Sequence, residues 1–94
     1  IIMKDVQQKT LTAGEATAFD MRLKRSQFLV KNFTDGNIRV KLGDNDSYSM
    51  IAANSFELVF NNIDNKVSSS AEATNVVTVT AEKAGLVEVS SIDF

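Results

Sequence analysis

The chain has 94 residues, a length that fits a single domain, and its charges nearly balance, with a formal net charge of −2 at pH 7. It contains no cysteine and no histidine, which excludes disulfides, thiolate metal sites and the commonest catalytic base. Nucleic-acid binding needs an excess of Lys and Arg, and no apolar run is long enough for a transmembrane helix. We therefore expect one domain over residues 1–94, with neither a nucleic-acid nor a membrane partner.

Hydrophobic residues recur at every second position along most of the chain, as expected for strands with one buried face. In residues 17–23, for example, Phe19 and Met21 alternate with Asp20 and Arg22. Eight short strands are predicted, over residues 4–12, 17–23, 28–33, 37–42, 47–52, 55–60, 75–80 and 85–94. Their number and rhythm predict an all-β fold, either an antiparallel β-sandwich or a jelly-roll-like small barrel.

The dipeptide Asp35-Gly36 lies between two of these strands. Asp-Gly favours a type I′ hairpin turn, because both central residues of that turn need a positive φ. A two-residue loop would gather on one face the apolar side chains of Leu29, Phe33, Ile38, Val40 and Leu42. Phe28, Val30 and Lys31 are the exceptions to this pattern. We predict a β-hairpin at this position.

The next turn contains Asp44, Asn45 and Asp46, followed closely by Tyr48. The three clustered oxygen-bearing side chains are of the kind that Ca²⁺ prefers, but their spacing does not fit an EF-hand loop. Tyr48 is the one aromatic residue well placed to stack on a sugar, and it suits a core or an interface equally well. We expect a turn without metal or cofactor, and these four residues form the candidate corner for a ligand or partner.

The longest polar segment covers residues 61–73. Polar loops of this length in small domains are often functional or mobile, and the simplest interpretation is a crossover between two sheets. Within and just after it, residues 68–74 could form one short helical turn capped by serine.

Several valines fall on strand faces that the alternation predicts to be exposed, namely Val30, Val59 and either Val76 or Val77. With no proline to protect strand edges, these residues suggest a surface for association with other chains. The alternation of residues 55–60 places three large side chains on one face, which we expect to be buried: Phe56, Leu58 and Phe60.

Catalysis has few candidate residues in this sequence. Only carboxylates, lysines and one tyrosine are present to act as the base that would activate a nucleophile. Glu57 and Glu88 alternate outward on their predicted strands, where solvated charge is normal. We predict that the protein is not an enzyme.

Three stretches carry a resemblance to a known class of protein: "TLTAGEATAFDM", "QFLVKNFTDGNIRVKLGDNDSYSMIAANSFELVF" and "AGLVEVSSIDF". Their order resembles small structural proteins of tailed phages, of the head-fibre or head-decoration type. Many such sequences have a glycine before the "SFEL"-type strand. This chain has Asn54 there, which also tolerates a positive φ.

The resemblance implies a compact β-sandwich that serves as a virion component, assembled in the bacterial cytoplasm. Its partners would be other virion proteins, further copies of itself, or both. The alternative is a carbohydrate- or ligand-binding module of a bacterial surface or phage tail protein, located at the cell surface. Such a module would contact glycan through the corner at residues 43–48 or through residues 61–73.

Overall fold

The computed structural model describes residues 6–25, 27–43, 48–60 and 74–91, and these residues form eight β-strands. The strands are β1 (Val6–Leu11), β2 (Ala16–Arg25), β3 (Gln27–Asn32), β4 (Ile38–Leu42), β5 (Tyr48–Ile51), β6 (Phe56–Phe60), β7 (Thr74–Ala81) and β8 (Gly85–Ser91). Each overlaps one of the eight segments that the alternation of the sequence predicts. The expected all-β class is confirmed.

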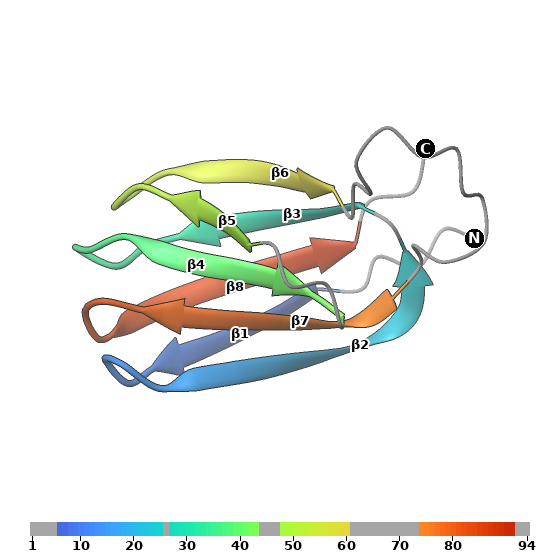
Figure 1. Cartoon of the computed structure of the whole chain (residues 1–94), viewed down its shortest axis with the longest axis horizontal. Helices are drawn as coiled ribbons and strands as arrows, with labels where there is room; N and C mark the ends of the chain where they lie inside the picture. The colour runs from blue at the N-terminus through green and yellow to red at the C-terminus, as the bar shows by residue number, and fades with distance from the viewer. Residues whose placement is uncertain (1–5, 26, 44–47, 61–73, 92–94) are drawn as a thin grey trace.

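The strands form two four-stranded sheets that pack face to face (Figure 1). Sheet A has the order β1-β8-β3-β6 and sheet B the order β2-β7-β4-β5, with every pairing antiparallel. β1 pairs with β8, β2 with β7, β3 with β6, and β4 with β5. This is the strand order of a jelly roll. The turns after β1, β3, β5 and β7 each cross between the sheets, and all four lie at one end of the sandwich, called here the turn end (Figure 1).

The core fills the space between the sheets and draws on all eight strands. Phe19 and Met21 are buried and Asp20 and Arg22 are exposed, as the alternation predicts. The buried hydrophobic residues are Leu11, Phe19, Met21, Phe28, Val30, Ile38, Val40, Leu42, Ile51, Val59, Val77, Val79, Ala81, Val87 and Val89. Valines dominate this set, in keeping with the preference of β-branched residues for pleated, half-buried surfaces.

The predicted hairpin at Asp35-Gly36 is wrong. β3 belongs to sheet A and β4 to sheet B, so the two strands do not pair and the segment between them is an arch that crosses the sandwich. Neither Asp35 nor Gly36 has a positive φ, which a type I′ turn requires at both positions. Gly36 instead allows close approach, because a Cβ there would lie 3.1 Å from Lys83 Cγ and 3.3 Å from Glu82 Cβ.

A buried polar cluster, formed by Asn32 and Thr34, holds this arch in place. Asn32 Nδ2 donates to the carbonyl oxygens of Gly36 (2.9 Å), Ile51 (3.2 Å) and Ala52 (3.0 Å). Its Oδ1 accepts from the backbone N–H and the hydroxyl of Thr34, at 2.9 and 2.7 Å. One amide side chain therefore links the β3–β4 arch to the β5–β6 arch and satisfies backbone groups that would otherwise be buried without partners.

The β5–β6 arch contains Asn54, whose φ is +55°. Asn54 thus has the left-handed backbone conformation that glycine adopts most easily, as its tolerance of a positive φ predicts. The backbone N–H of Asn54 donates to the Thr34 carbonyl at 3.2 Å, so the two arches are also joined through their main chains.

The strand faces in two parts of sheet A are the reverse of those predicted. Val30 and Val59, which we expected to be exposed, are in the core, as is Val77 in sheet B. Phe56, expected in the core, is 70% exposed, and Phe33 is 50% exposed. Val76, the alternative to Val77, is half-buried. Phe33 and Phe56 thus lie on the outside of sheet A, whereas Val30 and Val59 lie on the inside together with Phe28.

β1 and β6, the two edge strands of sheet A, each have a charged side chain that points toward sheet B. On β1, Lys9 Nζ donates to the Ala18 carbonyl of β2 (2.8 Å) and lies 5.2 Å from the centre of the Phe19 ring. On β6, Glu57 pairs with buried Val30 and therefore has the inward orientation, but remains exposed at the sheet edge. Inward-pointing charges are one way in which proteins prevent edge-to-edge aggregation. No helix in the described part of the chain is long and apolar enough to cross a membrane.

Candidate association surface

The outer face of sheet A is made by alternate residues of its four strands. Directly paired residues project to the same side of a sheet, so the strand register shows which side chains share this face. We call it the sheet A face; its residues are Val6, Gln8, Thr10, Leu29, Lys31, Phe33, Phe56, Leu58, Leu86, Glu88 and Ser90.

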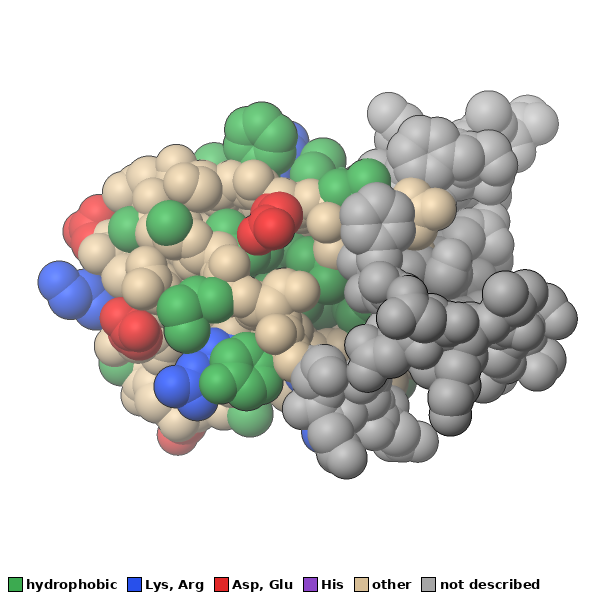
Figure 2. Space-filling model, turned by 45° about the horizontal axis from the view of Figure 1, so that its top comes forward, with side chains coloured by type: hydrophobic (Ala, Val, Ile, Leu, Met, Phe, Trp, Pro, Cys, Tyr) green, Lys and Arg blue, Asp and Glu red, His purple; other side chains and the backbone are tan. Residues whose placement is uncertain are grey.

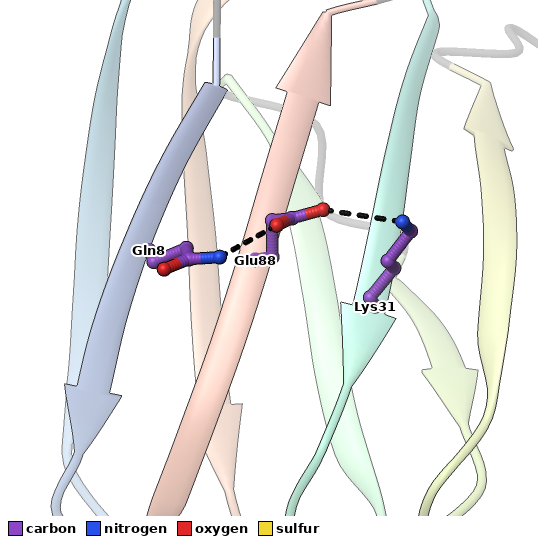
Figure 3. Close-up of polar contacts among 3 residues, drawn as sticks. All are labelled: Gln8, Lys31 and Glu88. Atoms are coloured by element: carbon purple, nitrogen blue, oxygen red, sulfur yellow. Dashed lines mark hydrogen bonds and ion pairs between the residues drawn. The ribbon is translucent and has the colours of Figure 1, made fainter.

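A polar row crosses the middle of the sheet A face. Its three members, shown in Figure 3, are Gln8 of β1, Glu88 of β8 and Lys31 of β3, which lie side by side on adjacent strands. Gln8 Nε2 donates to Glu88 Oε1 at 2.7 Å, and Lys31 Nζ lies 3.4 Å from Glu88 Oε2. Each carboxylate oxygen of Glu88 therefore has one partner, one from either neighbouring strand.

The partners of Glu88 change its acidity. The hydrogen bond from Gln8 lowers the pKa of Glu88 most, and Lys31 lowers it further through a hydrogen bond and its positive charge, while burial acts in the opposite direction. The net effect is a lowered pKa, because both partners stabilise the carboxylate form. The row is thus charged at neutral pH, with the anion on β8 and the cation on β3.

Apolar side chains lie on either side of this polar row. On the side of the turn end, Phe33 follows β3 and its backbone N–H donates to the Leu86 carbonyl of β8 at 3.0 Å. Phe56 lies opposite Lys31, at the β6 edge of the same face. On the other side of the row, Leu29 pairs with Leu58. Figure 2, turned so that the β5–β6 side of Figure 1 comes forward, shows the β5–β6 edge and the sheet B side, and the sheet A face points away from the viewer.

Large hydrophobic side chains of the sheet A face are exposed to solvent. Phe56, Phe33 and Leu86 are all among the exposed large hydrophobic residues, and none contributes to the buried core. Single exposed apolar side chains are common, whereas a cluster with polar neighbours marks a contact surface more often. Aromatic residues are also enriched at the centres of protein–protein interfaces. The arrangement suits a surface that another molecule covers.

The outer face of sheet B has a different composition. Small residues occupy β2 and β7, where Ala16 pairs with Thr80 and Ala18 with Thr78. On β4 and β5, Arg39 lies 5.1 Å from the centre of the Tyr48 ring, a cation–π contact that covers part of this aromatic side chain.

The candidate corner predicted from the sequence lies between β4 and β5 in the chain. Asp44, Asn45 and Asp46 fall outside the described residues. Tyr48, the first residue of β5, is exposed, and Gly43 just before the corner has a φ of +56°. The segment joins two paired strands, since β4 and β5 are antiparallel neighbours with Lys41 opposite Tyr48. Residues 61–73 also lie outside the described part. Of the helical turn predicted over residues 68–74, only Thr74 is described, and it begins β7.

Among the described residues, no group of three or more His, Cys, Asp and Glu side chains is arranged to hold a metal ion. No known family model matches the chain, and no curated protein or solved structure matches it either.

The sheet A face was not found from the sequence. The alternation predicts that its members lie either in the core, as for Phe33 and Phe56, or at ordinary solvated positions, as for Glu88. A signal was nevertheless present: Asn32 and Thr34 share one parity, and a pair of short polar residues beside an arch is suited to bonding backbone groups. Turning Asn32 inward turns Lys31 and Phe33 outward, because successive side chains point to opposite faces.

Proposed function

We propose that this protein is a non-enzymatic structural module, a component of a phage or prophage virion such as a head-decoration or fibre protein. It acts through protein–protein contacts made by the sheet A face. The observation that carries this proposal is the exposed cluster of Phe33, Phe56 and Leu86 around a charged row, on the outside of an otherwise well-packed sandwich.

Two further considerations support the proposal. The jelly roll is a fold used by viral capsid proteins, although lectins share it, and a fold alone does not determine function. The resemblance of the sequence to tailed-phage structural proteins favours the first of these uses and implies assembly in the bacterial cytoplasm. A partly apolar sheet face is well suited to binding another protein without catalysing a reaction.

The experiment compares two matched variants in particles. Tagged wild type, Phe56→Lys and Met50→Lys are each expressed in cells that produce particles from the parent genome, and the particles are purified by density gradient. Both positions are exposed, on sheet A and sheet B respectively. We expect wild type and Met50→Lys in the particles and Phe56→Lys to be depleted about ten-fold or more, as for loss of an interface anchor.

Absence of the wild-type chain from particles would contradict the virion role. Equal incorporation of both variants would contradict the role of the sheet A face. Binding to a glycan array that is lost in Tyr48→Ala would support the alternative, a carbohydrate-binding module.

A further inference from the structure

The charge arrangement of the sheet A face indicates what covers it. The two charges of the polar row lie on the two central strands, with Glu88 on β8 and Lys31 on β3, directly opposite one another in the register. A surface with an anion and a cation on either side of its midline is complementary to its own copy in one orientation. That orientation has a two-fold axis in the contact plane, parallel to the strands and between β3 and β8.

The opposite choice of axis is excluded by the same charges. A two-fold axis at right angles to the strands would place β3 over β3 and β8 over β8. Lys31 would then face Lys31 of the second copy, and Glu88 would face Glu88. Like charges placed together at an interface cost several kcal/mol, so this orientation is unfavourable.

The favoured axis also brings apolar side chains together at two places, whereas Phe56 of β6 lies over Gln8 of β1 in the second copy. It places β8 of one copy over β3 of the other, so Leu86 lies over Phe33 of the second copy on the side of the turn end. On the other side of the polar row, Val6 of β1 lies over Leu58 of β6 in the second copy. Packed sheets are rotated by about 30°, which displaces the outer strands most and the central ones least. The contacts of β3 and β8 are therefore the best defined.

We propose that the sheet A face binds a second copy of this chain in a two-fold dimer, with Lys31 and Glu88 of the two copies forming an alternating four-charge cluster. This inference rests on the proposed function, because it names the partner of the same face. Lys31 Nζ uses Glu88 within its own chain, and an ammonium group has three donors, so a second carboxylate can be accommodated. The net charge of only −2 gives little general repulsion between copies.

The sheet A face is small for a protein–protein interface. It is four strands wide at about 4.8 Å between strands, which places the contact at the small end of specific interfaces. We expect reversible dimerisation, with dissociation in the micromolar range or above.

The test uses charge reversal in both partners and sedimentation velocity over a concentration series. Lys31→Glu and Glu88→Lys are each expected to weaken self-association about ten-fold or more, because like charges then meet across the interface. An equimolar mixture of the two variants should restore association, since every contact across the interface again joins opposite charges. The double variant with both changes should dimerise like wild type.

Two further variants complete the experiment. Arg39→Glu makes the same change of charge on sheet B and should leave dimerisation unchanged. Leu86→Lys, at an exposed apolar position, should abolish dimerisation without removing the Lys31–Glu88 pair, and so remains informative if a single reversal prevents folding.

Wild type that stays monomeric at millimolar concentration would overturn the two-fold dimer. So would a dimer that neither reversal weakens, or a mixture that fails to associate. If depletion of Phe56→Lys from particles is still observed in that case, the proposed function stands and the partner is another virion protein. A dimer that behaves as described, together with absence of the chain from particles, would leave the dimer intact and contradict the proposed function.

Discussion

Lys31 and Asn32 are adjacent on β3 and belong to two very different regions. Asn32 is 1% exposed and its side chain is fully used by the polar cluster at the turn end. Lys31 points the other way, with its side chain 40% exposed in the middle of the sheet A face. The inner region determines which strands belong to which sheet, and the outer region affects the fold little. Changes in the first should alter stability, and changes in the second should alter association.

The largest effect is expected at the polar cluster. Asn32→Ala removes the partner of three carbonyl oxygens and of Thr34, and should lower the free energy of unfolding by about 3 kcal/mol or more, because buried polar groups are left unsatisfied. The matched control is Asn37→Ala in the same arch, whose side-chain Nδ2 makes a long contact to Met50 Sδ (3.8 Å) and no other hydrogen bond within the described residues of the arch. It should change the same free energy by less than about 0.5 kcal/mol. Urea titration measures both, and similar losses would contradict the role of the cluster.

A second comparison tests the inner and outer sides of β6. Val59→Ser should cost about 2–3 kcal/mol, since it removes buried apolar volume and introduces a hydroxyl into the core. Phe56→Ser, on the opposite side, should change stability by less than about 0.5 kcal/mol. The alternation of the sequence alone predicts the reverse order. Chemical denaturation of the two variants decides between them.

Gly85 connects the turn end to the start of β8. A Cβ at this position would lie 2.8 Å from Thr34 Cγ2 and 3.1 Å from Thr34 Cα. Gly85→Ala should therefore cost about 1–3 kcal/mol through overpacking. Adding Thr34→Ser removes the nearest methyl group and keeps the hydroxyl, so a double-mutant cycle should show partial recovery. Strict additivity of the two changes would argue against this contact.

The smallest effect concerns pH and the polar row. The folded-state pKa of Glu88 is lowered from its ordinary value of 4.5, so the carboxylate stabilises the fold above that pH. The contribution is lost as pH falls through the lowered folded-state pKa. Wild type should thus lose stability on acidification more steeply than Glu88→Gln, which keeps the hydrogen-bond acceptor but does not titrate. Thermal melts between pH 6 and about 2.5 measure this loss. Parallel curves of melting temperature against pH for the two proteins would contradict the prediction.

The sequence predicts the strands well because alternation depends only on local order. All eight segments and the all-β class follow from it. The positive φ of Asn54 is expected instead from the resemblance, in which glycine is common at that position. Alternation does not show which of two alternating faces is buried when both contain apolar residues. In residues 28–33, one face contains Phe28, Val30 and Asn32, and the other contains Leu29, Lys31 and Phe33.

The choice between these faces depends on partners that are distant in the sequence. Asn32 is turned inward because it bonds Ile51 and Ala52, about twenty residues along the chain. The local sequence around Asp35-Gly36 predicts a hairpin. In the structure, however, β3 pairs with β6 and β8, and β4 pairs with β5 and β7. The sheet A face could not be predicted for the same reason, since it is the set of positions that these long-range pairings leave outside.

The most direct test of the association surface is an NMR concentration series on the wild-type chain. Dimerisation through the sheet A face predicts concentration-dependent shifts for the Leu86 methyl groups and the Phe33 ring, and none for Ala18 and Met50 on sheet B. Shifts confined to Met50 and Tyr48, or spectra that do not change up to millimolar concentration, would contradict the account.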